Sequence, residues 1–221
     1  MKIAVCGEQS RVEEFKSIIG SHELTVIENA DADFSEFDLI ADMNADDELT
    51  IPDSAFSSGK FILLCAVKKT LLDILKEKKI SSQVAGINAL PTFLNRPVQE
   101  ISFLKKENEE QWKNIFSELN WKIKVVKDEV GMVSPRILFM IINEASFTLD
   151  EGTASASDID SGMKLGTAYP EGPLAWADKI GVKNIYETLL AMKMKSNDSR
   201  YKISGLLEKH FLSKTNFSLA E

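Results

Sequence analysis

The sequence lacks any long apolar run. No stretch approaches the ~18 consecutive apolar residues that a membrane-spanning helix needs, so we expect no membrane association of that kind. The first apolar segment, residues 1–6, ends at Gly7 and is too short for a signal peptide, so it is expected to form a strand. The two cysteines, Cys6 and Cys65, both lie in apolar runs. Buried free thiols are typical of a reducing compartment, which predicts a cytoplasmic protein.

Positive charge is also scarce. The chain has 26 Lys and Arg residues against 34 Asp and Glu, a net charge of −8 and a sequence pI near 5.0. Without a concentrated basic face, nucleic acid is not an expected partner. The sequence has no paired-cysteine metal motif, no P-loop and no G-x-S-x-G nucleophile elbow. Asp158 and Asp160 are explained by the start of a capped helix, so no metal site is predicted.

The first 127 residues combine short β-like runs with helix-like runs. The β-like runs do not alternate between apolar and polar residues, which is typical of strands that are buried on both faces. Such strands, separated by helices, predict an α/β fold with a doubly wound parallel sheet. The predicted strands are 2–6, 24–27, 38–41, 61–67, 83–87 and 121–127, and the predicted helices are 11–19, 70–79 and 109–119.

The remainder of the chain has no strand-like run. An apolar stripe at helical spacing begins at Val133 and continues to Ala145. Ser155 and Asp158 form a capping-box pattern that opens a further helix, and residues 174–194 supply more. The sequence therefore predicts two domains, an α/β domain at 1–126 and an all-helical domain at 127–221.

Residues 125–181 carry a set of specific motifs. They read VKD–G–V–R, NEA, EG–AS–DID, MKLG and YP–GPL–W–D–IG, and Arg200-Tyr201 and Leu206-Leu207 follow. In this combination the segment closely resembles the C-terminal domain of the 3-hydroxyacyl-CoA dehydrogenase family, in particular the 3-hydroxybutyryl-CoA type. The resemblance implies an N-terminal Rossmann-like domain that binds NAD and a helical domain that dimerises. It therefore implies a homodimer through the helical domain, or a heterodimer with an active homologue.

The dinucleotide fingerprint departs from the family pattern. A dinucleotide site needs three glycines after the first strand, for the tight turn, for the approach of the pyrophosphate and for helix packing. Here Gly7 stands at the first position, while Gln9 and Val12 occupy the other two. Glu28 ends the second strand at the position of the acidic residue that holds a ribose hydroxyl. Its alternative interpretation is a solvated carboxylate at a strand end.

The family's coenzyme A arm is missing from this sequence. In the family a helical arm between the second and third strands contacts the coenzyme A part of the substrate. Only residues 29–37 separate Glu28 from the next predicted strand, which is enough for a loop and too few for a helical hairpin. The N-terminal domain is therefore expected to be a shortened, reduced version of the Rossmann-like fold.

The acid–base pair of the family is altered as well. Family members carry a histidine in a segment that reads roughly G-x-H-F-F-N-P, and a later glutamate orients it. Asn88 falls at the histidine position and Glu100 at the glutamate position. Asparagine can donate a hydrogen bond, but it cannot exchange a proton near neutral pH. The two histidines of the chain, His22 and His210, match nothing in this motif.

Two further positions differ from the family. An asparagine that helps to hold the substrate carbonyl is replaced by Pro135, which has no polar side chain. A serine-rich stretch after the fourth strand is replaced by residues 66–70, which contain Lys68 and Lys69. These lysines are interpreted as the solvated start of a helix or, alternatively, as contacts for an anionic ligand.

Two functions follow from these observations. The first is a catalytically impaired or inactive homologue, a pseudoenzyme that is dimeric, needs no cofactor and binds a partner or an acyl-CoA-like ligand. The second is an active NAD-dependent 3-hydroxyacyl-CoA dehydrogenase of fatty-acid metabolism, in which Glu100 or a water molecule moves the proton. NAD is an expected cofactor only in the second case.

Overall fold

The computed structural model describes residues 1–28, 32–76 and 78–217. Its contacts divide the chain into two compact units, Met1–Met132 and Val133–Glu221, which we call the first and the second unit. Within the described ranges, every helix is either too short or too polar to cross a membrane.

The division lies six residues after the predicted boundary at 126/127. Hydrogen bonds explain why residues 127–132 belong to the first unit. The Asp128 carboxylate accepts the backbone N–H groups of Leu71 and Leu72 at 2.7 and 3.1 Å. The backbone N–H of Gly131 donates to the carbonyl of Val67 at 2.7 Å. Residues 127–132 are thus tied to residues 67–72 of the first unit.

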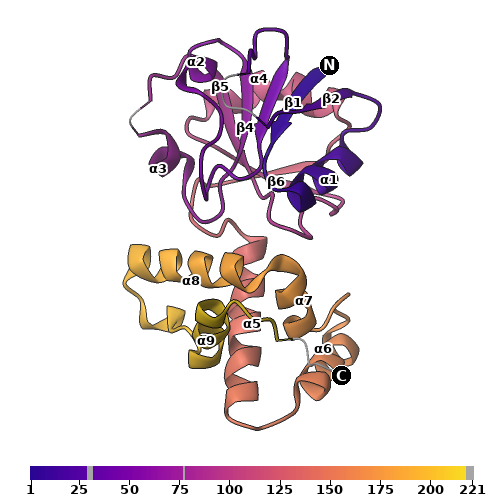
Figure 1. Ribbon diagram of the computed structural model, residues 1–221, viewed down its shortest axis with the longest axis vertical. Helices are drawn as coiled ribbons and strands as arrows, with labels where there is room; N and C mark the ends of the chain where they lie inside the picture. The colour runs from indigo at the N-terminus through magenta and orange to yellow at the C-terminus, as the bar shows by residue number, and fades with distance from the viewer. Residues whose placement is uncertain (29–31, 77, 218–221) are drawn as a thin grey trace. The chain divides into compact units, whose positions relative to one another are not determined.

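The first unit is built on a seven-stranded sheet with the order β2-β1-β3-β4-β5-β6-β7 (Figure 1). Neighbours from β2 to β5 are parallel, whereas β6 is antiparallel to β5 and parallel to β7. The predicted α/β class with a doubly wound parallel sheet is confirmed, and the sheet is mostly parallel. The strand β6, which runs antiparallel to β5, is one that the sequence pattern did not predict. The strands are β1 Lys2–Cys6, β2 Glu23–Val26, β3 Leu39–Asp42, β4 Phe61–Cys65, β5 Gln83–Ile87, β6 Gln99–Phe103 and β7 Ile123–Val126.

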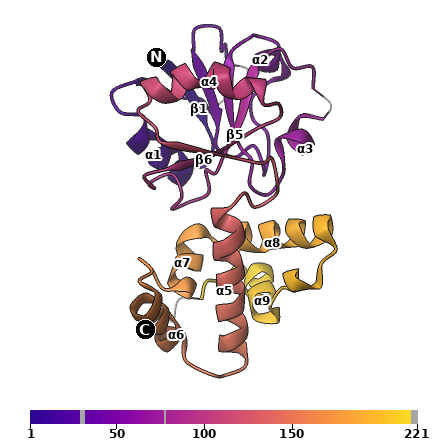
Figure 2. The ribbon, with the colours of Figure 1, turned by 180° about the vertical axis from the view of Figure 1, so that it is seen from behind.

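Helices lie on both faces of this sheet. Alternate strand residues such as Ala4, Ile40 and Leu64 share one apolar cluster with residues of the helices α2 and α3. On the other face, the indole N–H of Trp121 donates to the carbonyl of Ile18 at 2.8 Å and so links the ends of α1 and α4. Figure 2 shows α4 lying across the strands. The helices are α1 Gln9–Ile18, α2 Asp53–Phe56, α3 Leu71–Leu75 and α4 Glu107–Glu118.

The chain winds in opposite directions from β1. The helix α1 leads from β1 to β2 on one side, and β3 pairs with β1 on the other. In open α/β sheets the loops separate at such a point, and ligand clefts form outside the carboxyl ends of the strands. The described part of the β2–β3 connection, residues 27–28 and 32–38, contains no helix, while residues 29–31 of the predicted loop lie outside the described residues.

The second unit consists of helices around α5, which spans Ser134–Asp150 and contacts each of its neighbours (Figure 1). The side chain of Ser155 accepts the backbone N–H of Asp158 at 3.2 Å, which confirms the predicted capping box. The other helices are α6 Ala156–Thr167, α7 Pro173–Ile180, α8 Val182–Ser196, the 3₁₀ helix η1 Ser199–Tyr201 and α9 Gly205–Ser213.

Candidate functional site

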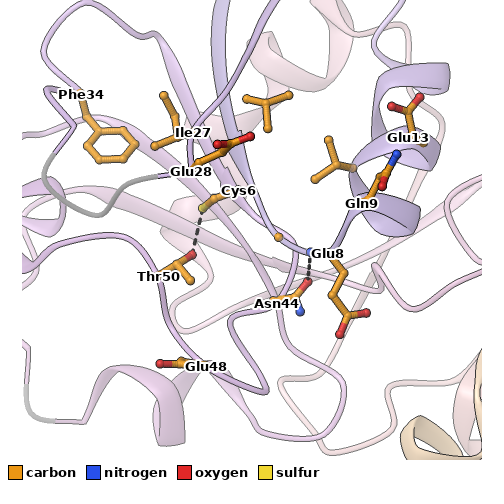
Figure 3. Close-up of a pocket in the computed structure, with 13 residues that line it drawn as sticks. Cys6, Glu8, Gln9, Glu13, Ile27, Glu28, Phe34, Asn44, Glu48 and Thr50 are labelled. Carbon is orange, nitrogen blue, oxygen red and sulfur yellow. Dashed lines mark hydrogen bonds between the residues drawn. The ribbon is translucent and has the colours of Figure 1, made fainter.

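A cleft of about 790 Å³ opens at the carboxyl ends of β1, β2 and β3 (Figure 3). Its position is the one that the reversal of winding at β1 predicts. Gly7, which follows β1, and Glu28, which follows β2, both line it, as the fingerprint predicts for a cofactor site. The structure therefore brings together the two residues that the sequence assigned to cofactor binding.

The glycine at position 7 is required by a close contact within the protein. Its φ of +141° is a backbone conformation that residues with a side chain rarely adopt. A Cβ at this position would lie 2.8 Å from Asn44 Oδ1 and 3.0 Å from Met43 Cβ. Gly7 thus lets the turn after β3 approach the start of α1.

Asn44 fills the space that this approach creates. Its Oδ1 accepts the backbone N–H of Glu8 at 2.8 Å, at the residue that precedes α1 (Figure 3). Backbone N–H groups at the start of this helix are the donors that bind a diphosphate in dinucleotide-binding folds. Here one of them is already used by a side chain of the protein.

Four glutamates line the cleft and give it a negative charge, namely Glu8, Glu13, Glu28 and Glu48. Figure 3 shows Glu28 close to Cys6, Glu8 beside Asn44, and the other two farther apart. Glu8 Oε2 lies 3.9 Å from Arg11 Nε, whereas the ion pairs of the described residues leave the other three without a basic partner. The lining residues include no lysine, arginine or histidine in the part of the chain that the structure describes.

A buried ionic network lies next to the cleft. Arg11 is 1% exposed, and its guanidinium donates to the carbonyl of Met43 at 2.8 Å and to Asp47 Oδ2 at 3.1 Å. The Asp46 carboxylate lies 3.6 Å from the same guanidinium. Asp46 also accepts the backbone N–H groups of Val67 and Lys68 at 3.1 and 2.9 Å. These contacts fasten α1 to the loops that follow β3 and β4.

Lys68 belongs to this network. Its side chain is buried and pairs with Asp47. The expectation of a solvated helix start is therefore wrong for Lys68, although Lys69 is exposed. The interpretation as an anion contact does not fit either, because the ammonium group is already neutralised by Asp47 inside the protein.

The thiol of Cys6 forms part of the floor of the cleft. Burial raises the pKa of Cys6 to about 12, and the hydroxyl of Thr50 donates to its sulfur at 3.1 Å. The backbone N–H of Thr50 donates to the carboxylate of Asp42, whose pKa is raised by burial. A thiol of this kind stays protonated at neutral pH and is a poor nucleophile.

Asn88 and Glu100 stand at the end of the β5–β6 pairing. The last antiparallel pair is Ile87 with Ile101, so Asn88 follows the one strand residue and Glu100 precedes the other. Asn88 is buried, and its Oδ1 accepts the backbone N–H of Leu90 at 3.3 Å. Its carboxamide therefore closes the turn after β5. Among the described residues, no group of three histidine, cysteine, aspartate or glutamate side chains could hold a metal ion.

Pro135 lies in the second unit, in the first turn of α5, and is buried. A proline is well tolerated there because backbone N–H groups of the first turn have no partner within the helix. The next residue, Arg136, donates to the hydroxyl of Tyr201 at 2.7 Å and so links α5 to η1.

Comparisons with known proteins match the second unit. Residues 131–216 match the family model described as 3-hydroxyacyl-CoA dehydrogenase, C-terminal domain. The 3-hydroxyadipyl-CoA dehydrogenase of Escherichia coli is 38% identical over 92 residues, which are 42% of this chain and 19% of that protein. The probable 3-hydroxybutyryl-CoA dehydrogenase of Bacillus subtilis is 41% identical over 85 residues, which are 38% of this chain and 30% of that protein. The matched segments thus span less than a third of either relative.

The second unit is thus a C-terminal domain of the 3-hydroxyacyl-CoA dehydrogenase type.

Solved structures extend the likeness over both units. The (S)-3-hydroxybutyryl-CoA dehydrogenase PaaH1 from Ralstonia eutropha has a TM-score of 0.73 at 18% identity, covering 96% of this chain and 94% of that one. FadB2 from M. tuberculosis has a TM-score of 0.77 at 15% identity, covering 100% and 99%. At these identities the likeness shows the fold, a Rossmann-like domain followed by a helical domain.

The motif residues of this dehydrogenase-type domain form hydrogen bonds with other parts of the second unit. The carboxamide of Asn143, from the NEA motif, donates to the carbonyl of Lys202 and accepts the N–H of Ser204, both at 2.9 Å. The carboxylate of Asp160, from the DID motif, accepts the N–H groups of Leu174 and Ala175 at the start of α7, at 2.8 and 2.9 Å. These residues join helices to one another.

Sequence reasoning missed Asn44 and Arg11. A signal for Arg11 was present, because it stands beside Val12 and one turn before Phe15 on the buried side of α1. A charged residue at such a position is expected to have a buried partner. Asn44 offered no comparable signal, since its role depends on the approach of two loops that are distant in the sequence.

Proposed function

We propose that this family member is a dimeric binding homologue that does not transfer hydride with NAD. The observation that carries the proposal is the hydrogen bond from the Glu8 N–H to Asn44 Oδ1, at the place where a diphosphate would need that donor. Gln9 and Glu8 add a long side chain and a negative charge beside the same position. The residues of the cleft do not fit a dinucleotide.

The position of the acid–base group supports the same proposal. Asn88 cannot accept and return a proton near neutral pH, and its oxygen already closes a turn. Loss of general acid–base catalysis lowers a rate by roughly 10²–10⁴-fold. Glu100 is left without the imidazole that it orients in the family.

Exposed apolar side chains of the second unit support a dimer. Ile137 on α5 is 57% exposed and Leu165 on α6 is 88% exposed. Between these helices lies an apolar groove of about 410 Å³, which includes Ile141 and Met163. Apolar surface of this kind is typical of a protein interface. The partner is a second copy of this chain or an active homologue, and an acyl-CoA-like molecule is a further candidate ligand.

The free, buried thiols of Cys6 and Cys65 support a cytoplasmic location, where thiols stay reduced.

Titration with NADH tests the first part of the proposal. Energy transfer from tryptophan to bound nicotinamide reports binding, and Trp112 and Trp121 lie in the first unit. The B. subtilis relative, titrated in parallel, serves as the positive control. We expect no saturable signal from this protein up to millimolar NADH. Saturation at micromolar NADH would contradict the proposal.

Sedimentation velocity tests the dimer. We expect a dimer at micromolar concentration, and a shift toward monomer in Leu165→Glu and in Ile137→Glu. Leu72→Glu, on a side chain of the first unit that is 64% exposed, is the matched control and is expected to leave the dimer unchanged. A wild-type monomer that captures no purified family enzyme would refute this part of the proposal.

The second candidate is an active NAD-dependent 3-hydroxyacyl-CoA (3-hydroxybutyryl-CoA) dehydrogenase of fatty-acid metabolism. The place of Asn88 and Glu100, each next to the last residue pair of β5 and β6, favours it, because a carboxylate in that region could move the proton. In that case 3-hydroxybutyryl-CoA should support NADH formation that disappears in Glu100→Gln. Activity that survives this substitution would point to a contaminating enzyme.

A further inference from the structure

The loop after β3, residues 43–48, carries a run of hydrogen-bond acceptors, and we call it the acidic loop. Asn44 Oδ1 is the first of these acceptors, and it takes the N–H of Glu8 at 2.8 Å, at the residue before α1 (Figure 3). One end of the acidic loop therefore covers the N-terminus of that helix. The polar side chains of the loop are Asn44, Asp46, Asp47 and Glu48.

Asp46 occupies a second set of donors. Its Oδ2 accepts the consecutive backbone N–H groups of Val67 and Lys68, at 3.1 and 2.9 Å, just after β4. The guanidinium of Arg11 lies 3.6 Å from its Oδ1. Consecutive N–H groups beside a guanidinium are donors with which proteins bind anions. Here the anion is a carboxylate of the protein itself, and Asp46 is only 2% exposed.

Asp47 adds a second carboxylate to the same region. Its Oδ2 accepts a hydrogen bond from the guanidinium of Arg11 at 3.1 Å, and its Oδ1 pairs with the ammonium group of Lys68. The donors that the acidic loop satisfies thus lie on α1 and after β4, at the carboxyl ends of the parallel strands. Ligands of open α/β sheets bind at that edge. The acidic loop therefore makes, inside the protein, contacts that an anionic ligand would seek there.

Hydrogen bonds to the backbone hold the acidic loop in this position. The Asp42 carboxylate accepts the N–H groups of Asn44 at 3.0 Å and of Thr50 at 2.8 Å, near the two ends of the loop. Between them, the N–H groups of Asp47 and Glu48 donate to the carbonyl of Asn44 at 2.8 and 3.0 Å. A contact made by an ordered loop of the same chain is favoured over the same contact made by a dissolved ligand, which loses translational freedom on binding.

We propose that the acidic loop is a built-in ligand of the first unit, which occupies the anion-binding donors at this edge of the sheet and closes it to dinucleotides. The inference rests on the proposed function and names what closes the cleft to NAD. It also separates this cause from the missing fingerprint glycines. With glycine at position 9, a pyrophosphate would still meet an N–H group that Asn44 occupies. Restoring the fingerprint alone therefore leaves the cleft closed.

NADH titration of full-chain variants, followed by energy transfer from tryptophan, tests this inference. Gln9→Gly/Val12→Ala restores the fingerprint, whose third position accepts alanine, and is expected to show no saturable binding up to millimolar NADH. Adding Asn44→Ala and Asp47→Asn to this variant removes one acceptor and one charge from the acidic loop. The resulting fourfold variant is expected to bind NADH saturably, at least about tenfold more tightly than the fingerprint variant.

The matched control adds Asn114→Ala and Glu107→Gln, two exposed positions of α4, to the fingerprint variant. It removes the same charge away from the acidic loop and is expected to bind no NADH. Equal binding in the control and the fourfold variant would mean a general charge effect and would overturn the inference. Binding by the fingerprint variant alone, or no binding by a fourfold variant that melts like the wild type, would overturn it and leave the proposed function standing. Saturable binding by the wild type would overturn both.

Hydrogen exchange of the Glu8 amide tests the contact itself through single substitutions. Asn44→Ala removes the acceptor, and the Glu8 N–H is expected to exchange at least about tenfold faster than in the wild type. Asn44→Asp keeps an oxygen at the same place and is expected to exchange like the wild type. Equal exchange in all three proteins would show that Asn44 does not hold this N–H group. That result would overturn the inference whether or not the multiple variants fold.

Discussion

The two units of this protein differ in how closely their sequences resemble those of known dehydrogenases. The second unit shares 38–41% of its residues with curated dehydrogenases in the matched segments. The whole chain shares only 15–18% with the structures that it resembles at TM-scores of 0.73–0.77. The first unit has the Rossmann-like fold of these structures, while Gln9 and Val12 stand where the dinucleotide fingerprint has glycine.

This difference follows from the roles of the residues concerned. Asn143 and Asp160 in the second unit join helices, so their loss would affect the fold itself. In the first unit, position 9 is the one that lets a pyrophosphate approach the backbone, while the sheet is held by its apolar core, which includes Ile3 and Leu63. Ligand-binding residues can change while such a core stays intact.

The strongest test of this comparison is a substitution in the buried ionic network of the first unit. Arg11→Met leaves the Asp46 carboxylate buried without its guanidinium partner, and we expect a loss of about 3–5 kcal/mol in the free energy of unfolding. Urea unfolding followed by tryptophan fluorescence measures it. Lys16→Met, on the exposed side of α1, is the control and should change little.

A double variant separates charge from packing in this network. In Arg11→Met/Asp46→Asn both charges are gone, and the carboxamide oxygen can still accept the N–H groups of Val67 and Lys68, so a large part of the lost stability should return. If Arg11→Met alone lowers the free energy of unfolding by less than about 1 kcal/mol, the network does not fasten α1 to the loops after β3 and β4. The physical explanation given for the difference between the two units would then be wrong.

Asn143→Ala tests the second unit with a smaller expected effect. The substitution leaves the carbonyl of Lys202 and the buried N–H of Ser204 without their partner, at a cost of about 1–3 kcal/mol. Thermal or urea unfolding measures it against Glu144→Ala, an exposed neighbour in the same motif. If Asn143→Ala and Glu144→Ala are equally stable, the hydrogen bonds of Asn143 do not stabilise the second unit.

The smallest expected effect is a pH dependence in the second unit. Burial lowers the pKa of His210 below its ordinary value, while its Nδ1 lies 2.9 Å from the Thr215 hydroxyl. A lowered histidine pKa means that the unfolded chain takes up the proton first, so stability is full above about pH 6.5 and falls as the pH drops through the folded pKa. Unfolding midpoints between pH 8 and pH 5 should show a flatter dependence in His210→Gln than in the wild type. Identical profiles would exclude a contribution from this residue.

The sequence predicted most strands because their residues form short, continuous apolar runs, as in β4. The strand β6 was missed because QEISF mixes polar and apolar residues and follows a proline-containing turn. The helix at 70–79 is shorter than predicted, since α3 ends at Leu75. Gly7 and Glu28 were placed in one cleft by pattern alone, because loops at the carboxyl ends of neighbouring parallel strands meet there.

The sequence by itself determined the dehydrogenase-type C-terminal domain, the two-part architecture and the absence of glycine at positions 9 and 12, because these depend on local pattern and motif spacing. Only the tertiary structure decided that Asn44 occupies the Glu8 N–H, that Arg11 and Lys68 are buried with Asp46 and Asp47, and that four glutamates line one cleft. Those contacts join residues from separate elements of the first unit. Their partners are fixed by how the sheet brings loops together, which local sequence pattern does not encode.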